Sequence, residues 1–449
     1  MKIRKTVLCF FAASVGMLLC SCNTTAPVSS PDSDVVVSGA FLSNPSAVEE
    51  IRKQHPEIQY KKTESSYNST NVLPMAVSGQ LPTMYSVPYT EPQRIIDAGY
   101  AGDVTEVFKQ HGYDKLLNKT YLDLVYKDGE YYGVPLFVYN IGLMCNISIF
   151  REAGLLDENG CPIYPQTYEE LAQTASLIKK RTGKPGFFFA TTQNQGGWQF
   201  MNIAWSYGVT FIKEEDGRKT AAFNTLECVE ALRYVKDLKW KYDALPDEVY
   251  GDTDDMLAKY KESGVGMNFF ASSEIDRYTS KGWNKDNISL CRIPAGPCGR
   301  YSLQGGTVQM FKKDITKEQA EACFLWIDQV YNISTDEKVK KQLEEQCKRK
   351  NDIGFVVGYV GKNVWNSPEY DAMVEEIQET NANVDLKYFE DFQNGDGVTC
   401  KTEESINAQE LYHLFDLAIQ TVFLDENADP SQIIADTAEK FQKDYLDKV

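Results

Sequence analysis

The hydrophobic and polar positions of the chain alternate between short apolar runs and longer amphipathic stretches. Residues 35–37 form a β-branched run, residues 46–54 have a helical pattern, and residues 58–61 alternate between apolar and polar side chains. Short apolar or alternating runs predict strands, whereas apolar positions three to four residues apart predict a helix. This strand-helix-strand order with short connections predicts a parallel sheet with right-handed crossovers.

The same patterns recur further along the chain. Apolar residues at helical spacing, with acidic residues early in the segment, predict helices over residues 166–180, 227–240 and 315–331. Apolar runs at residues 187–190 and 265–270 predict buried strands. No internal repeat of roughly 20–50 residues is visible, so a solenoid is excluded and an α/β fold is expected.

The first residues predict an exported protein with a lipid anchor. A cationic start precedes an apolar run over residues 7–19, which is too short for a comfortable membrane span and is typical of a secretory signal. The sequence Leu19-Cys20-Ser21-Cys22 resembles the lipobox of bacterial lipoproteins. The resemblance implies removal of residues 1–21 and acylation of Cys22, with palmitate among the acyl groups, which would anchor the protein to a membrane. The alternative is an ordinary cleaved signal that happens to contain cysteine. Residues 22–34 are polar and predict a flexible tether.

The composition excludes several classes of protein. With 449 residues the chain is long enough for two or three domains. Lys and Arg number 46 and Asp and Glu 64, so the formal net charge is −18 and a nucleic-acid partner is not expected. The 6 Trp, 26 Tyr and 22 Phe supply far more apolar surface than a disordered chain carries.

Cysteine usage permits disulfides but does not indicate a metal site. Eight cysteines follow Cys22, at positions 145, 161, 228, 291, 298, 323, 347 and 400. Cys291 and Cys298 flank a turn rich in Pro and Gly and are the first pair to test for a disulfide, whereas the other six are expected to be small buried hydrophobic residues. No C-x-x-C pair occurs beyond the lipobox, so structural zinc has no support.

Catalytic and cofactor motifs are also missing from the sequence. The three histidines lie far apart, and the chain contains no H-E-x-x-H, no G-x-S-x-G, no Walker motif and no G-x-G-x-x-G. We therefore expect no cofactor, no metal and no enzymatic activity. Paired carboxylates for glycoside hydrolysis stay open, because 64 acidic residues offer many pairs and none of them stands out.

Several motifs resemble those of one family. The sequence DGEYYGVP at residues 128–135, then GLMCN at 142–146 and FREAGL at 150–155, is similar to a segment of the extracellular solute-binding proteins of bacterial ABC transporters, of the carbohydrate-binding type. Two positions depart from the pattern, because Cys145 replaces the usual aromatic residue and Ser273 stands where many relatives carry a ligand-stacking Trp. Further elements resemble the family in order along the chain, at residues 77–83, 165–171, 222–225, 263–267 and 293–297.

The resemblance implies a two-lobed α/β fold of the periplasmic-binding-protein type (type II), with mixed sheets flanked by helices and a hinge between the lobes. It places the N-terminal lobe at residues 35–140 and 294–352 and the C-terminal lobe at residues 141–293 and 353–449. The hinge crossings are expected near residues 139–142, 292–294 and 350–354. A ligand in such a fold is held between the lobes, where loops at the carboxyl ends of the strands converge.

A sugar ring has an apolar face and a rim of hydroxyl groups, so a sugar site needs aromatic rings and planar polar side chains. For each residue that we single out, the alternative role is packing in the core or, for glycine, a turn. The candidate ligand-binding residues are Phe41, Tyr85, Tyr89, Tyr139, Asn140, Gln195, Trp198, Phe270, Glu274 and Gly305.

The resemblance implies a monomeric, lipid-anchored receptor on the extracytoplasmic face of the cell membrane. Its partners would be a small-molecule ligand, expected to be a carbohydrate, and the permease subunits of an ABC importer. Ligand binding would favour a closed arrangement of the lobes, which the permease recognises. Three alternatives stay open: a receptor for iron, another small anion, a polyamine or a peptide; an exported glycan hydrolase; and a structural or adhesive lipoprotein.

Overall fold

The computed structural model describes residues 34–64, 66–68, 70–359 and 361–448. The expected signal sequence, the lipidated Cys22 and all of the expected tether except Asp34 lie outside these residues. Within the described part of the chain, no helix is both long and apolar enough to cross a membrane.

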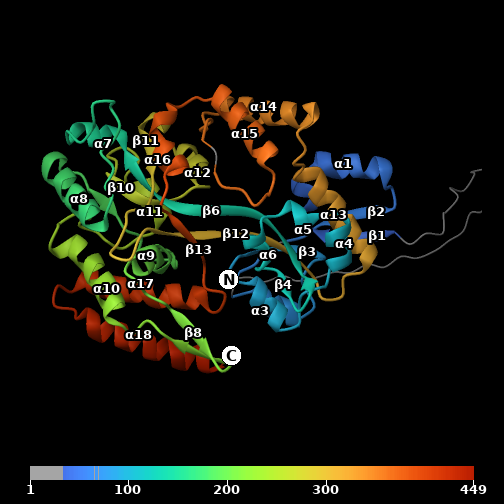
Figure 1. The fold of residues 1–449 in the computed structure, drawn as a ribbon, viewed down its shortest axis with the longest axis horizontal. Helices are drawn as coiled ribbons and strands as arrows, with labels where there is room; N and C mark the ends of the chain where they lie inside the picture. The colour runs from blue at the N-terminus through green and yellow to red at the C-terminus, as the bar shows by residue number, and fades with distance from the viewer. Residues whose placement is uncertain (1–33, 65, 69, 360, 449) are drawn as a thin grey trace, which may run out of the picture.

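Two large hydrophobic cores divide the molecule into two lobes (Figure 1). The core of the N-terminal lobe, on the right of the figure, includes Val37, Phe108 and Phe324. The core of the C-terminal lobe, on the left, includes Phe200 and Phe415, and a smaller cluster around Phe270 packs on the other face of its strands. Both lobes combine strands with flanking helices, so the expected α/β class is confirmed.

The N-terminal lobe begins with the expected strand-helix-strand unit. Strand β1 (Val35–Gly39) pairs in parallel with β2 (Ile58–Lys62), and helix α1 (Pro45–Gln54) connects them. The helix starts where Asn44 accepts a hydrogen bond from the backbone N–H of Ala47 and Pro45 occupies the first helical turn. Both features are typical of a helix N-terminus, and they explain why the sequence pattern located this helix.

One seven-stranded sheet runs through both lobes. Its order is β13-β12-β6-β10-β7, with β3 also paired to β12 and β11 also paired to β6. The long strand β6 pairs with β12 over its first half and with β10 and β11 over its second half. The strands are β3 (Met84–Pro88), β6 (Gly133–Asn146), β7 (Phe187–Phe188), β10 (Met267–Ala271), β11 (Ile288–Cys291), β12 (Tyr301–Phe311) and β13 (Thr399–Thr402).

The three helices expected in the middle of the chain are confirmed as α8, α10 and α13. Each begins after a threonine whose hydroxyl accepts a backbone N–H from the first turn, and these residues are Thr167, Thr225 and Thr316. The expected strand at 187–190 is shorter, because only its first two residues pair with β10. The helices are α8 (Tyr168–Thr182), α10 (Leu226–Trp240) and α13 (Lys317–Val330).

Further helices and two small hairpins complete the fold. The hairpins are β4 (Tyr126–Lys127) with β5 (Glu130–Tyr131), and β8 (Ile212–Glu215) with β9 (Arg218–Ala221). The other α-helices are α2 (Val72–Val77), α3 (Pro92–Asp97), α4 (Thr105–Gln110), α5 (Tyr113–Leu116), α6 (Lys119–Leu122), α7 (Ile147–Glu152), α9 (Gln195–Ser206), α11 (Thr253–Lys259), α12 (Ile275–Ser280), α14 (Glu337–Asp352), α15 (Pro368–Thr380), α16 (Glu390–Asn394), α17 (Ala408–Leu424) and α18 (Pro430–Asp444).

The chain passes between the two cores along β6 and again along β12. On β6, Val138 belongs to the core of the N-terminal lobe and Ile141 to that of the C-terminal lobe. On β12, Leu303 belongs to the C-terminal core and Val308 to the N-terminal core. The chain therefore re-enters the N-terminal lobe within β12, between residues 303 and 308, which is later than the crossing expected at residues 292–294. The reason is that the segment just after residue 294 stays hydrogen-bonded to the C-terminal lobe. For example, the backbone carbonyl of Ala295 accepts from the N–H of Tyr168 at 3.0 Å.

Helices α14 and α15 lie above the junction of the two lobes in Figure 1. They share a small core of Cys347, Val357 and Ile377. The segment that joins them contacts both sides, because Val356 packs with the cluster around Phe270 and Val364 packs in the N-terminal core.

The eight cysteines of the described chain are all free thiols. Cys291 is buried on β11, where its Sγ approaches the carbonyl oxygen of Leu143 at 3.6 Å. Cys298 is exposed, and its Sγ approaches the carbonyl oxygen of Tyr207 at 3.5 Å. The disulfide considered for Cys291 and Cys298 is therefore not formed, because the first thiol points into the core and the second packs against the end of α9.

Candidate functional site

The two strands that join the lobes bring Tyr139 and Trp198 together. Tyr139 lies on β6, and its ring centroid is 6.1 Å from that of Trp198 on α9, with the rings at 62°. Gly305 is paired with Tyr139 on the adjacent strand β12. A Cβ atom at Gly305 would overlap the hydroxyl group of Tyr139, so the missing side chain lets the phenol ring lie over β12. Three of the candidate residues are thus in one place.

Helix α9, which carries Trp198, is held at its start by a carboxylate from α17. Its N-cap, Asn194, has a left-handed backbone conformation and makes no capping bond with its side chain. Instead, Asp416 Oδ2 accepts from the N–H of Asn194 at 2.7 Å, and its Oδ1 accepts from the N–H of Gly197 at 2.8 Å. This carboxylate satisfies donors that the helix leaves free and suits the positive end of its dipole. The position of Trp198 therefore depends on α17.

Gln195, the first residue of α9, has a structural role in this arrangement. Its Oε1 accepts from the backbone N–H of Thr253 at 2.9 Å and from the hydroxyl of the same residue at 2.7 Å. The amide therefore connects α9 to the start of α11. It lies three residues before Trp198 on the same helix, but its acceptor oxygen is already in use.

Glu403 and Tyr412 form the acidic part of the site. The hydroxyl of Tyr412, on α17, donates to Glu403 Oε1, and Glu403 follows directly after β13. Burial raises the pKa of Glu403 to about 7. Burial and then the charge of Glu403 raise the pKa of Tyr139 well above its ordinary value, so the carboxylate and the phenol of Tyr139 are close enough to interact.

Two further acidic residues face this cluster, one from each lobe. Glu91, at the start of α3, is buried and forms an ion pair with Arg94 at 3.3 Å. Burial raises the pKa of Glu91 although the charge of Arg94 lowers it, and the charge of Glu410 on α17 adds to the rise. Glu274, before α12, is paired with Arg277, and its charge adds to the rise in the pKa of Tyr139. Carboxyl groups of both lobes therefore influence the same region.

Tyr89 lies at the edge of this cluster. Its ring packs over Gly306, where a Cβ atom would come within 2.6 Å of the ring, and its centroid is 6.2 Å from that of Tyr121. Its hydroxyl is buried and has no hydrogen-bond partner within the described chain. Burial raises the pKa of this phenol, with smaller contributions from Tyr121 and Glu403. Tyr89 therefore offers an unused hydrogen-bonding group near Glu403.

Three other candidates lie in the hydrophobic cores. Phe41 packs against Tyr60 and Trp326, and its side chain is fully buried. Phe270 packs against Tyr278 in the smaller cluster of the C-terminal lobe. Tyr85 is buried on β3, and its hydroxyl has no partner within the described residues. The structure does not bring these three aromatic residues to Tyr139.

Asn140 lies on the other face of β6 from Tyr139. Successive side chains of a strand point to opposite faces, so neighbours in sequence reach different surroundings. Asn140 lines two cavities, of about 370 Å³ and about 170 Å³, whose lining includes neither Tyr139 nor Trp198. The sequence grouped Tyr139 and Asn140 as a pair, and the strand separates them.

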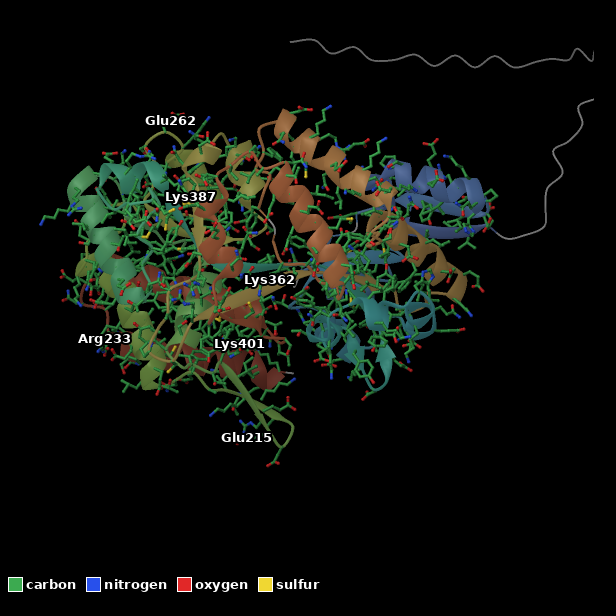
Figure 2. The ribbon with its side chains drawn as sticks, turned by 45° about the horizontal axis from the view of Figure 1, so that its top comes forward. Glu215, Arg233, Glu262, Lys362, Lys387 and Lys401 are labelled. Carbon is green, nitrogen blue, oxygen red and sulfur yellow. The ribbon has the colours of Figure 1, made fainter. Side chains whose placement is uncertain are left out.

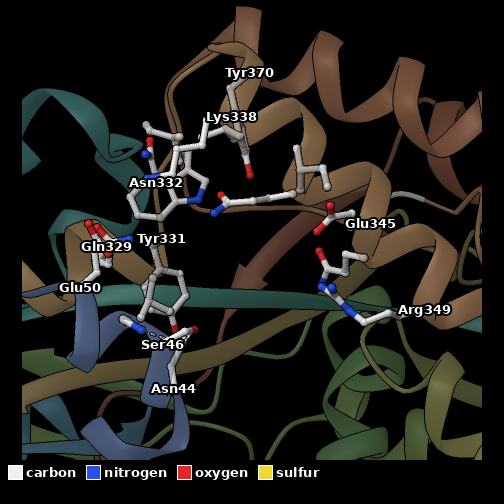
Figure 3. Close-up of a pocket in the computed structure, with 18 residues that line it drawn as sticks. Asn44, Ser46, Glu50, Gln329, Tyr331, Asn332, Lys338, Glu345, Arg349 and Tyr370 are labelled. Carbon is white, nitrogen blue, oxygen red and sulfur yellow. Dashed lines mark hydrogen bonds between the residues drawn. The ribbon is translucent and has the colours of Figure 1, made fainter.

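The cluster around Tyr139 combines two aromatic rings with carboxyl groups and phenols. Aromatic rings suit the apolar face of a ligand ring, and carboxylates accept hydrogen bonds from hydroxyl or ammonium groups. Within the described residues, no group of three or more His, Cys, Asp and Glu is arranged to hold a metal ion. A larger cavity of about 600 Å³, between α1, the end of α13 and the α14–α15 pair, contains none of the ten candidates (Figure 3).

Sequence reasoning missed Glu403, Glu91 and Tyr412. The family motifs fade before residue 403, and no local signal distinguishes one buried glutamate among 64 acidic residues. The position of Tyr412 in an amphipathic helix predicts only a core residue. Glu403 and Tyr412 become part of the site because β13 and α17 fold back beside β12 and α9. Glu91 reaches it because β3, which precedes α3, pairs with β12.

Comparison with known proteins identifies one family of binding proteins. The model of the family described as bacterial extracellular solute-binding protein matches residues 44–326. A protein of Brucella abortus (strain 2308), whose name describes it as a binding protein, is 27% identical over 205 residues. That match covers 45% of this chain and 47% of the relative, so the chain spans about half the length of the curated relatives it matches.

Solved structures have the same fold. A solute-binding protein of an ABC transporter from Thermotoga lettingae TMO, bound with α-D-tagatose, aligns with a TM-score of 0.67 and 16% identity, over 91% of this chain and 99% of that one. The GacH receptor of Streptomyces glaucescens GLA.O aligns with a TM-score of 0.67 and 18% identity, over 91% and 98% of the chains. Maltose-bound MalE3 of T. maritima aligns with a TM-score of 0.64 and 18% identity, over 91% of this chain and 99% of that one. At these identities the comparison shows the fold alone, and it confirms the expected type II arrangement.

Proposed function

The chain belongs to the family of bacterial extracellular solute-binding proteins, and on that basis we propose that it captures a sugar or oligosaccharide between its two lobes and delivers it to an ABC importer. The observation that carries the proposal is the cluster of Tyr139, Trp198 and Glu403, which lies where β6 and β12 join the lobes. Aromatic rings suit the apolar face of a pyranose, and carboxyl groups accept hydrogen bonds from its hydroxyl groups. The structural neighbours include proteins crystallised with tagatose, acarbose and maltose.

The proposed division into lobes follows the two cores. The N-terminal lobe would comprise residues 35–140 and the chain from the middle of β12 through α13, and the C-terminal lobe the residues between these crossings and the chain after α16. A ligand that contacts Glu91 from one lobe and Trp198 from the other favours a closed arrangement, because only that arrangement makes both sets of contacts. A micromolar ligand provides about 8 kcal/mol, enough to cover a few kcal/mol of closure.

We further propose that the protein is a monomeric lipoprotein anchored through Cys22 on the extracytoplasmic face of the membrane, without catalytic activity. The support is the lipobox-like sequence at residues 19–22 and a family and fold of binding proteins. Metabolic labelling with palmitate tests the anchor. The native protein should incorporate the label and fractionate with membranes, whereas a Cys22→Ser variant should do neither.

A cationic solute such as a polyamine is the second candidate. It is favoured by the carboxyl groups of Glu91, Glu274, Glu403 and Glu410, which come from both lobes and influence one region. Two of these carboxyl groups are neutralised in part, Glu91 by Arg94 and Glu274 by Arg277, which reduces the preference for a cation.

The deciding experiment is a thermal-shift screen of the purified protein, followed by calorimetric titration, against mono- and oligosaccharides, polyamines, amino acids and ferric iron. The proposal predicts that one or more sugars raise the melting temperature and are recovered unchanged. A response to polyamines alone would replace the sugar with the second candidate. Release of product from a glycan would show a hydrolase instead.

A further inference from the structure

Two adjacent cavities lie on the face of β6 opposite to Tyr139. Their volumes are about 370 Å³ and about 170 Å³, and the larger is within the range typical of small-molecule sites. Both are lined by Asn140, Lys362, Phe392 and Gln393. Figure 2 shows Lys362 near the middle of the molecule, between the two lobes.

The larger cavity is built from three separate parts of the chain. Asn118 and Tyr121 come from the N-terminal lobe, and Asn140 comes from the strand that joins the lobes. The remaining residues come from the segment around α15 and from α16: Gly361, Lys362, Asn363, Trp365, Asp371, Val374, Glu375, Phe392, Gln393 and Asn394. No local sequence pattern places these residues together.

Asn140, which lines this cavity, carries a buried hydrogen-bond acceptor without a partner in the described chain. Its side chain is only 5% exposed, and its Oδ1 has no partner within the described chain. A buried acceptor without a partner is costly, so its presence indicates that something else supplies a donor. The backbone of Asn140 is fixed by two bonds to Ser272: Asn140 N–H donates to Ser272 Oγ at 3.2 Å, and its carbonyl accepts from Ser272 N–H at 2.9 Å.

The side chains around Asn140 favour a neutral molecule with several hydroxyl groups. Tyr121, Trp365 and Phe392 supply three aromatic surfaces, and the other polar residues of the lining are mostly amides and carboxyl groups. Asp371 accepts from Asn363 Nδ2 at 2.7 Å, which holds both polar groups in place. The lining contains one lysine and two carboxyl groups, so an anionic ligand is disfavoured.

The cavity is distinct from the cluster around Tyr139. Tyr139 and Asn140 are consecutive residues whose side chains lie on opposite faces of one strand, and the cavity lining contains none of Tyr139, Trp198, Glu403 and Tyr412. Tyr121, which lines the cavity, is the point nearest to the cluster, since its ring centroid is 6.2 Å from that of Tyr89. Trp365 also lines the 600 Å³ cavity of Figure 3, where Tyr331 and Tyr370 add two aromatic residues. Polar groups and aromatic rings therefore continue from Asn140 toward α1 and α14.

We propose that the cavity at Asn140 is a second binding site, which takes a neutral polyhydroxylated molecule of about the size of a monosaccharide. Because both lobes and the joining strand line it, a molecule bound there opposes any movement that changes the distance between Tyr121 and Phe392. Its occupancy and that of the site at Tyr139 are then coupled, and the coupling acts equally in both directions. The inference does not depend on which solute the site at Tyr139 takes.

The test uses the full-length protein and four variants. Trp198→Ala disables the cluster at Tyr139. Asn140→Ala removes the amide from the second cavity, and Tyr121→Phe removes one hydroxyl from it with little change in volume. Asn427→Ala, at an exposed position before α18, is the matched control. Binding of glucose, galactose, mannose, xylose and glycerol is measured by saturation-transfer NMR and calorimetry, and melting curves confirm that each variant folds.

The proposal predicts that at least one of these probes still binds the Trp198→Ala protein. Adding Asn140→Ala or Tyr121→Phe should weaken that remaining binding by about tenfold or more, whereas Asn427→Ala should leave it unchanged. Loss of all binding in the Trp198→Ala protein, or remaining binding that both cavity variants leave intact, overturns the proposal. A crystal soaked with the probe that shows only water beside Asn140 also overturns it.

The outcomes distinguish this proposal from the proposed function. Binding that depends on Trp198 alone supports the receptor site and rejects the second cavity. Binding that depends on Asn140 and Tyr121 but is unaffected by Trp198→Ala supports the cavity and rejects Tyr139 and Trp198 as the solute site.

Discussion

The hydroxyl of Tyr412 donates a hydrogen bond to Oε1 of Glu403, with 3.2 Å between the two oxygens. Burial raises the pKa of Glu403 to about 7, against an ordinary value of 4.5. The folded protein therefore retains a proton on this carboxyl group at pH values where the unfolded chain has lost it. Stability is unaffected by this group below about 4.5, decreases as the pH rises from there to about 7, and levels off above that.

Replacing Glu403 with Gln should reduce this pH dependence. The amide is neutral at every pH, so the difference in unfolding free energy between about pH 4.5 and pH 8 should shrink by roughly 3 kcal/mol. Urea unfolding at several pH values measures it. Glu426→Gln, at an exposed position, is the control and should leave the curve unchanged. An unaltered profile for Glu403→Gln would show that folding does not raise the pKa of Glu403.

Trp198→Ala should weaken solute binding by about tenfold or more, because it removes the ring that lies against Tyr139. Titration calorimetry with the solute found in the screen measures the loss. Trp240→Ala is a matched control, since Trp240 lies partly exposed on α10 of the same lobe. Equal affinities of the native protein and the Trp198→Ala variant for the solute would show that Trp198 does not contribute to the proposed site.

Gly197→Ala should destabilise the protein by about 2 kcal/mol or more. A Cβ atom at this position would overlap the backbone of Tyr412, so α9 and α17 would have to move apart. Chemical denaturation measures the change. Gly361→Ala is the control, because its Cβ would meet Tyr359 only at ordinary contact distance, 3.8 Å or more. Equal stabilities for the two variants would contradict close packing of the two helices.

Asp416→Asn should cost about 1–2 kcal/mol of stability and weaken solute binding as well. An asparagine can accept through only one oxygen, so either Asn194 N–H or Gly197 N–H loses its partner at the start of α9. Denaturation and calorimetry measure the two effects. Asp444→Asn, which breaks an exposed ion pair with Lys440, should change neither by a comparable amount. Binding that is fully retained in Asp416→Asn would show that the position of Trp198 does not depend on α17.

Thiol titration should find the eight cysteines after Cys22 reduced in the native protein. The structure has each of them as a free thiol, with Cys291 buried and Cys298 exposed. A reducing agent should therefore leave the melting temperature unchanged, and a rapid thiol reagent should label Cys298 before Cys291. A mass spectrum with a peptide that links these two cysteines would contradict the structure.

The sequence by itself determined the local elements and the fold class. Threonine and asparagine caps, proline in the first turn and apolar spacing act within a few residues, so α1, α8, α10 and α13 could be predicted from neighbouring residues alone. The parallel pairing of β1 and β2 followed from the short helical connection between them. The ordered series of motifs indicated the type II fold through its resemblance to a known family.

Only the tertiary structure decided which of these residues meet. Tyr139 and Asn140 are neighbours in the sequence and were equally good candidates for ligand contacts. Because side chains alternate along a strand, Tyr139 points toward Trp198 and Asn140 lines a separate cavity. Phe41 follows strand β1, and Phe270 lies within β10 rather than in the loop expected after it, and neighbouring helices cover both rings. Glu403 reaches Tyr139 from more than half the chain away, through the pairing of β13 with β12. Contacts of this kind depend on how distant segments pack, and no local pattern of side chains encodes them.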